Sequence, residues 1–150
     1  MAFELHPKLE ADTVRVTDFG LCRVVLMNDA SYPWLILVPK REGVTEVTDL
    51  LSEEQLQLMM EITFVAERLQ DVTGCDKLNI AALGNQVPQL HIHVIARFTS
   101  DRAWPHPVWG RYPPVPYGKR ELDEQVGRLA ERFSRTEIAM PFTSHSDDTP

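Results

Sequence analysis

Hydrophobic and polar residues alternate along the chain with two periods, and these periods predict the order of strands and helices. Residues 13–28 contain two apolar or alternating runs on either side of Gly20, a pattern that predicts a β-hairpin. The run PWLILVPK, residues 33–40, is short, apolar and bounded by prolines, as expected of a buried strand with fixed ends. Strand character returns in residues 77–83 and 89–98, on either side of a GNQVP turn.

Two further segments show the helical period. Ser52 and Gln55 form a capping-box pattern that starts the first helix, and Gly74 is well placed to end it. The apolar face expected for this helix contains Leu56, Met59, Met60, Thr63, Ala66 and Val72. A second amphipathic helix is expected near residues 119–134. This order of elements predicts an α+β fold, with a largely antiparallel sheet of about five strands covered by helices on one face.

Length, charge and cysteine content narrow the function classes. A chain of 150 residues has the length of a single domain, and we expect a core at residues 13–134 and a loose tail at residues 141–150. The formal charge of −7 argues against nucleic-acid binding, which needs dense positive charge. No apolar stretch reaches the roughly 18 residues of a membrane span, and the N-terminus lacks signal-peptide features. Because Cys22 and Cys75 form no recognisable disulfide framework, we expect a soluble protein of the reducing cytoplasm.

Two histidines lie two residues apart in the apolar stretch PQLHIHVIARF, residues 88–98. In a strand, Gln89, His91 and His93 point to one face, and the aliphatic residues between them point to the other. The two imidazoles then lie about 6.6 Å apart along the strand, a distance that suits a phosphate group and its leaving atom. One neutral imidazole can attack phosphorus while the other binds the anion or protonates the departing group.

Two other interpretations of the histidine pair stay open. Histidines on a half-solvated strand can be surface residues without a function. A His-x-His pair on a strand is also a common pair of zinc or iron ligands, and His106 is the further candidate nearby in the sequence. Because no Glu, Asp or Cys lies at a sequence spacing that is typical of a further metal ligand, we expect no metal and no other cofactor.

The stretch VPQLHIHVIAR resembles the signature of the histidine-triad (HIT) superfamily, in which three histidines alternate with apolar residues after a Gly-Gln turn. The upstream segment LMNDASYPWLILVPK is similar to the family's segment in which an Asn or Asp ends one strand and an apolar strand with a final Pro-Lys follows. The resemblance covers roughly residues 13–110. Two positions depart from the family pattern: Gln89 replaces the first histidine, and Gly84–Asn85 replaces the Gly-Gln pair.

The resemblance implies a HIT-like fold and a nucleotide hydrolase or nucleotidyl transferase. Such an enzyme cleaves a phosphoanhydride or phosphoramidate bond, with a dinucleoside polyphosphate or a nucleoside phosphoramidate as substrate. It implies that His91 is the nucleophile of a covalent nucleotidyl intermediate and that His93 contacts the phosphate and the leaving group. Gln89 can donate and accept hydrogen bonds but never carries charge. Two alternatives therefore remain: a catalytically weakened nucleotide-binding module, and a metal-dependent enzyme that uses His91, His93 and His106.

The resemblance also implies which residues surround the substrate. It assigns the ribose hydroxyls to Asn28 or to its neighbour Asp29, and it gives Asn85 the phosphate contact of the usual glutamine. It places Leu26 in the base-binding cleft. The polar candidates also have structural interpretations, because Asn28 and Asp29 suit a turn before a proline and Asn85 follows a glycine.

HIT-like proteins are typically two-fold homodimers, and the resemblance implies one here. Their chain often carries a tryptophan toward the partner's active site, and Trp104 or Trp109 could do this. The alternative is that these large side chains pin a proline-rich loop onto the body of the domain. The long helix offers Met59, Met60 and Phe64, more apolar surface than one packed face needs, which favours an interface there.

Overall fold

The computed structural model describes residues 3–134 and residue 138, so the tail expected at residues 141–150 lies outside the described residues. Within them, the strands are β1 (Thr13–Asp18), β2 (Cys22–Met27), β3 (Trp34–Pro39), β4 (Lys77–Ala81) and β5 (Ile92–Arg97). They form one sheet in the order β1–β2–β3–β5–β4, and every neighbouring pair is antiparallel. The predicted hairpin and the proline-bounded strand are therefore confirmed.

The helices of the described chain are α1 (Pro7–Asp12), a 3-10 turn (Val47–Asp49), α2 (Ser52–Thr73) and α3 (Lys119–Ser134). Gly74 ends α2 as expected, in the left-handed conformation with φ of 63°. The sequence pattern did not predict α1, which is too short to show a helical period. Among the described residues, no helix has the length and apolar character needed to cross a membrane.

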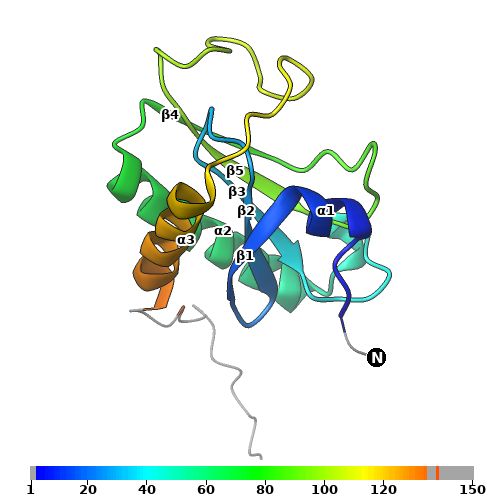
Figure 1. The fold of residues 1–150 in the computed structure, drawn as a ribbon. Coiled ribbons are helices and arrows are strands. Elements are labelled where there is room, and N and C mark those ends of the chain that lie inside the picture. Colours follow the sequence, from blue (N-terminus) through cyan, green and yellow to red (C-terminus); the bar gives the residue numbers. More distant parts are fainter. Residues whose placement is uncertain (1–2, 135–137, 139–150) are drawn as a thin grey trace, which may run out of the picture.

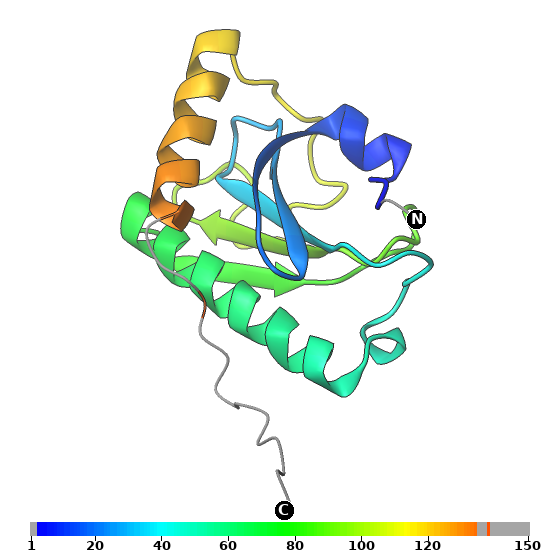
Figure 2. The ribbon, with the colours of Figure 1, turned by 90° about the horizontal axis from the view of Figure 1, so that it is seen from below.

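The sheet separates two hydrophobic layers. Figures 1 and 2 show α2 and α3 along one side of the sheet and α1 on the other. On the helical side, Leu35 and Val94 of the sheet pack in one core with Leu69 of α2 and Leu129 of α3. Leu9 of α1 belongs to the second core, on the opposite face. The predicted α+β architecture, with the two long helices on one face, is confirmed.

The inward face of α2 differs from the predicted one. It contains Leu58, Glu61, Ile62, Val65, Ala66 and Leu69. Leu56, Met59 and Thr63 of the predicted face are exposed instead. The physical reason is Glu61, which is fully buried and accepts the backbone N–H groups of Leu21 and Cys22 at 3.0 and 2.7 Å. Because a glutamate lies in the middle of the inward face of α2, the hydrophobicity pattern of the sequence does not reveal this face.

The cap of α2 lies one residue before the predicted one. The side chain of Glu54 accepts the backbone N–H of Leu51 at 3.1 Å, so Leu51 takes the capping position. Gln55 instead donates its side-chain amide to the carbonyl oxygen of Leu50 at 3.0 Å. Ser52 is the first residue of the helix.

Phe64 of α2 is buried within its own chain. Its ring packs edge-on against Phe19 at 5.5 Å and lies 6.4 Å from the ring of Phe133 of α3. The expectation that Phe64 adds to an outward apolar surface is therefore wrong, because the ring belongs to the core beneath α3. The exposed apolar residues on the outside of α2 are Leu56 and Met59, at 45% and 60% exposure.

Candidate active site

A cleft of about 750 Å³ lies on the sheet face opposite α2 and α3. Residues of α1, of the turn after β2, of the loop before β5 and of the 108–116 segment line it. Both histidines of the predicted pair, His91 and His93, contribute to the lining. The cleft therefore brings together segments that lie far apart in the sequence.

His91 stands just before β5 rather than inside it. The strand begins at Ile92 instead of residue 89, because the N–H of Leu90 pairs with the carbonyl oxygen of Val44, outside the sheet. His91 is buried, and its Nδ1 lies 2.7 Å from the carbonyl oxygen of Gln89. Because a carbonyl oxygen only accepts hydrogen bonds, Nδ1 carries the hydrogen and Nε2 keeps a free lone pair.

His93 has the opposite tautomer. The indole Nε1–H of Trp34 donates to Nδ1 of His93 at 2.9 Å, so the ring hydrogen must sit on Nε2. Burial, with a smaller contribution from the nearby His91, lowers the pKa of His93 to about 4. His93 is therefore neutral at pH 7 and presents an N–H donor. The centres of the His91 and His93 rings lie 5.0 Å apart. The lone pair on Nε2 of His91 and the hydrogen on Nε2 of His93 are therefore available to the same small part of a ligand.

Two tryptophans, Trp34 and Trp109, enclose His93. The ring of Trp109 packs edge-on against His93 at 5.2 Å and against Trp34 at 6.2 Å. Both tryptophans line the cleft of their own chain. The expectation that Trp109 reaches a partner's active site stays a prediction. Sequence reasoning missed Trp34, although its position at the start of a strand beside the histidine strand is a usable signal.

Trp104 does not line the cleft. It is 36% exposed, and the guanidinium of Arg97 lies 5.6 Å from the centre of its ring. Arg97 is buried and pairs with both carboxylate oxygens of Asp101, at 2.7 and 3.0 Å. Trp104 therefore fits the alternative in which large aromatic side chains hold the proline-rich loop on the body of the domain.

Asn28 and Asp29 both line the cleft. Each also holds the segment that leads to α3: Asn28 Oδ1 accepts the N–H of Tyr117 at 2.9 Å, and Asp29 Oδ1 accepts the N–H of Val115 at 3.3 Å. Asp29 Oδ1 also accepts the N–H of Ser31 at 3.0 Å. The two residues thus shape one wall of the cleft and present polar groups to it.

Asn85 also lines the cleft, but Leu26 does not. Leu26 is only 1% exposed and packs in the core beneath the helices. Side chains alternate across a strand, so its neighbour Met27 faces the cleft instead. The expectation for Leu26 is therefore wrong by one residue.

The side chain of Gln89 is held by the N-terminal segment that leads into α1. Its Oε1 accepts the N–H of His6 at 2.8 Å, and its Nε2 donates to the carbonyl oxygen of Glu4 at 2.9 Å. Gln89 precedes β5, is not among the residues that line the cleft, and is engaged by the segment that leads into α1. Its place beside the two catalytic histidines stays a prediction.

The proposed metal-ligand set does not form. Within residues 3–134 and 138, no three His, Cys, Asp or Glu side chains come together to bind a metal ion. His106, the predicted third ligand, is exposed and does not line the cleft with His91 and His93. The alternative based on these three histidines is therefore wrong.

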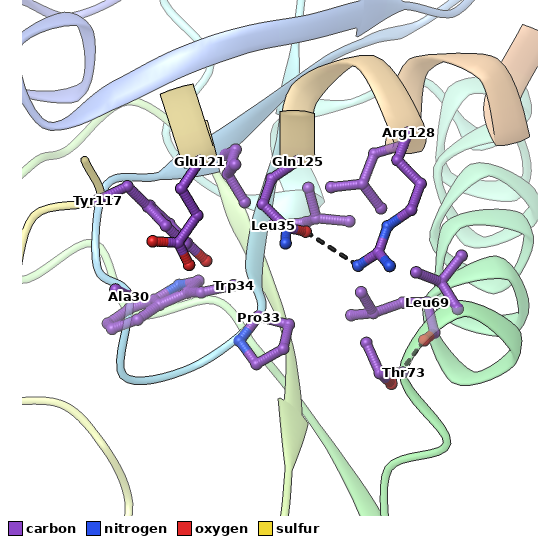
Figure 3. Close-up of a pocket in the computed structure, with 13 residues that line it drawn as sticks. Ala30, Pro33, Trp34, Leu35, Leu69, Thr73, Tyr117, Glu121, Gln125 and Arg128 are labelled. Carbon is purple, nitrogen blue, oxygen red and sulfur yellow. Dashed lines mark hydrogen bonds between the residues drawn. The ribbon is translucent and has the colours of Figure 1, made fainter. Parts of the chain in front are cut away.

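A second, smaller cavity of about 160 Å³ lies on the helical side. Figure 3 shows Glu121, Gln125 and Arg128 of α3 on one side of it and Thr73 of α2 on another. Arg128 donates to Gln125 at 3.0 Å. None of the described residues that line this cavity is a histidine or cysteine, so the nucleophile candidates belong to the larger cleft.

Comparisons with known proteins identify the family of this chain. The model of the HIT domain matches residues 8–100. A histidine triad protein from Bradyrhizobium japonicum is 48% identical, with a TM-score of 0.85 over 88% of this chain and 98% of that one. A histidine triad protein from Marinobacter aquaeolei VT8 is 43% identical, with a TM-score of 0.87 over 93% of this chain and 100% of that one. A histidine triad protein from Sinorhizobium meliloti 1021 is 45% identical, with a TM-score of 0.84 over 87% of this chain and 96% of that one. No curated protein is significantly similar in sequence. The chain belongs to the HIT domain family.

Proposed function

We propose that this protein is a nucleotide hydrolase or nucleotidyl transferase that uses His91 as its nucleophile. The substrate is a dinucleoside polyphosphate or a nucleoside phosphoramidate, and the bond cleaved is a phosphoanhydride or a phosphoramidate. The observation that carries this proposal is the pair of complementary tautomers: Nε2 of His91 has a lone pair, and Nε2 of His93 has a hydrogen. One site thus holds a nucleophile for phosphorus and a donor for the phosphate oxygens.

The reaction follows from these two nitrogens. The lone pair of His91 Nε2 attacks the phosphorus, a nitrogen–phosphorus bond forms, and the bond from phosphorus to the leaving group breaks with its electron pair. A leaving polyphosphate oxygen departs as an anion, and a leaving nitrogen takes a proton from solvent as it departs. The ring then carries a positive charge, and the carbonyl oxygen of Gln89 at Nδ1 stabilises it. Water, or another acceptor in a transferase, attacks the same phosphorus and loses its proton to solvent, and the nitrogen–phosphorus bond breaks with its electron pair returning to Nε2 of His91.

The role of His93 is hydrogen-bond donation rather than proton transfer. Because its pKa is lowered to about 4, little of it is protonated at pH 7, and a neutral imidazole is a poor acid. Its Nε2–H can still donate to a non-bridging phosphate oxygen as negative charge develops there. A polyphosphate leaving group departs as an anion, so this arrangement suits it well.

The remaining walls of the cleft suit a nucleoside. Leu9, Met27 and Val108 supply apolar surface for a base. Asn28 or Asp29 holds the ribose hydroxyls, and Asn85 contacts the phosphate. Both Asn28 and Asp29 stay candidates because both line the cleft.

Substitution of His91 tests the nucleophile directly. We expect His91→Ala to lower kcat for diadenosine tetraphosphate by at least about a thousandfold, because no other group replaces the attacking lone pair. His106→Ala is the matched control, since His106 is an exposed histidine outside the cleft and its loss leaves kcat unchanged. A His91→Ala protein that keeps more than about a tenth of the turnover contradicts the mechanism.

A nucleotide-binding module without turnover is the second candidate function. The observation that favours it is the position of Gln89, whose side chain supplies no group to the cleft. The wild-type protein distinguishes the two. Nucleotide binding with no turnover at saturating substrate would establish the module, and turnover that depends on His91 would establish the enzyme.

We also propose a homodimer in the cytoplasm. Exposed Leu56 and Met59 on the outer face of α2 support an interface there, and the free cysteines Cys22 and Cys75 fit a reducing compartment. Light scattering tests the dimer: a particle mass of about twice the 17.1 kDa chain is expected, and the mass of one chain contradicts it. We propose no nucleic-acid or membrane partner.

A further inference from the structure

The side chain of Gln89 fastens the N-terminal segment to the site. Its amide uses both of its polar atoms on backbone groups more than eighty residues away in the sequence: it accepts from His6 at 2.8 Å and donates to Glu4 at 2.9 Å. An amide matches such a pair because it presents one donor and one acceptor side by side. The imidazole that the family pattern places here has two ring nitrogens that diverge, so it cannot bind both backbone groups in this way.

The fastened segment leads directly into α1 and the cleft. Nδ1 of His6 accepts the backbone N–H of Lys8 at 3.1 Å and so caps the start of α1. Leu9, the next residue, is 4% exposed and packs in the core on the cleft side of the sheet. Gln89 therefore sets the first turn of α1 through His6, while Leu9 anchors the helix independently.

Lys8 brings positive charge to the cleft. Among the described residues that line the cleft, it is the only lysine or arginine. Its Nζ pairs with Asp12 at 2.9 Å, but both side chains are well exposed, at 55% and 41%. A pair so exposed contributes little to stability, so a phosphate can take the place of Asp12 at low cost.

We propose that Lys8 binds the phosphate chain beyond the phosphorus that His91 attacks, and that Gln89 is a positioning residue for Lys8. The site then selects nucleotides with two or more phosphates over monophosphates. This inference rests on the proposed nucleotide chemistry and adds a subsite to it. Gln89, which replaces the first histidine of the triad, thus helps to bind the substrate's distal phosphates by positioning α1. It does not act on the phosphorus that His91 attacks.

Binding of two adenine nucleotides to the full chain tests the subsite. The probes are AMP and α,β-methylene-ADP, whose carbon bridge resists cleavage, and calorimetry gives both affinities. We expect Lys8→Ala to weaken α,β-methylene-ADP about tenfold, the loss of one charge-assisted hydrogen bond, and AMP by less than about twofold. Lys8→Arg should restore most of the difference. Lys77→Ala, which removes an exposed lysine of β4 outside the cleft, should change neither affinity.

Gln89→Met tests the positioning role, because methionine keeps the length of the side chain but forms neither backbone hydrogen bond. We expect a selective loss of α,β-methylene-ADP affinity of about threefold to fivefold, and no further loss when Gln89→Met is added to Lys8→Ala. In kinetics with diadenosine tetraphosphate, Gln89→Met should raise KM by a similar factor.

The outcomes separate this inference from the proposed function. If His91-dependent turnover is present but Lys8→Ala weakens both nucleotides equally or neither, the subsite is overturned and the proposed function stands. If Gln89→Met weakens AMP and α,β-methylene-ADP equally, or adds its full effect to Lys8→Ala, the positioning role is overturned. A wild-type protein that binds neither nucleotide overturns both the proposed function and this inference.

Discussion

The two faces of β5 bury different kinds of side chain. Ile92, Val94 and Ala96 face the helices and are buried among other apolar side chains. On the other face, the buried His93 and Arg97 each have a specific hydrogen-bond partner. The helical face needs only volume and shape, and any apolar group of the right size contributes. The cleft face holds buried polar groups whose partners fix their orientation and leave one polar edge for a ligand.

The largest expected effect distinguishes the two faces by stability. Leu37 of β3 is fully buried on the helical side, and Leu37→Ala should lower the free energy of unfolding by about 2–5 kcal/mol through lost burial and a residual cavity. Met59→Ala, at an exposed position of α2, should change it by less than about 0.5 kcal/mol. Urea denaturation measures both. A small effect at Leu37 contradicts the view that this face carries the stability.

The next prediction uses the pH dependence of the cleft face. The folded state holds the pKa of His93 at about 4, below its ordinary value of 6.5. Above pH 6.5, His93 is neutral in both the folded and the unfolded protein. As the pH falls from 6.5 toward 4, His93 is protonated in the unfolded protein but stays largely neutral in the folded one. The wild-type protein should therefore lose stability relative to His93→Gln, which does not titrate, by up to about 3 kcal/mol between pH 6.5 and 4. A stability difference that stays constant across this window contradicts the buried, neutral His93.

The smallest expected effect concerns the partner that orients His93. Trp34→Phe keeps an aromatic ring but removes the N–H donor to Nδ1 of His93. The hydrogen of His93 can then move to Nδ1, which leaves Nε2 without a donor for phosphate. We expect kcat to fall about tenfold, equivalent to one hydrogen bond of about 1.4 kcal/mol. Trp104→Phe is the control outside the cleft and should leave kcat unchanged.

The contrast between the faces also explains what the sequence could predict. The hairpin, β3 and the helix at residues 119–134 follow from local apolar patterns, and all three are confirmed. The resemblance around His91 and His93 located the cleft residues, because the two histidines lie two residues apart where β5 begins. Elements governed by local patterns were therefore predictable.

Features that depend on distant polar partners were not predictable. The pairing of Trp34 with His93 joins residues 59 positions apart, and Gln89 binds His6 from a distance of 83 positions. The buried face of α2 was missed because Glu61 lies in it, and only its bonds to the β1–β2 turn explain the burial. A hydrophobicity pattern records burial of apolar groups but not the partners that allow polar groups to be buried.

If the lone pair of His91 attacks phosphorus, a covalent nucleotidyl intermediate forms on this residue and can be trapped. The protein is mixed with a dinucleoside polyphosphate labelled in the nucleotide, quenched in denaturant at alkaline pH, where a nitrogen–phosphorus bond survives, and digested for mass spectrometry. We expect a nucleotidyl adduct on the peptide that contains His91, present in the wild type and His106→Ala and absent in His91→Ala. Turnover without any adduct during the first cycle, or an adduct on another residue, would contradict it.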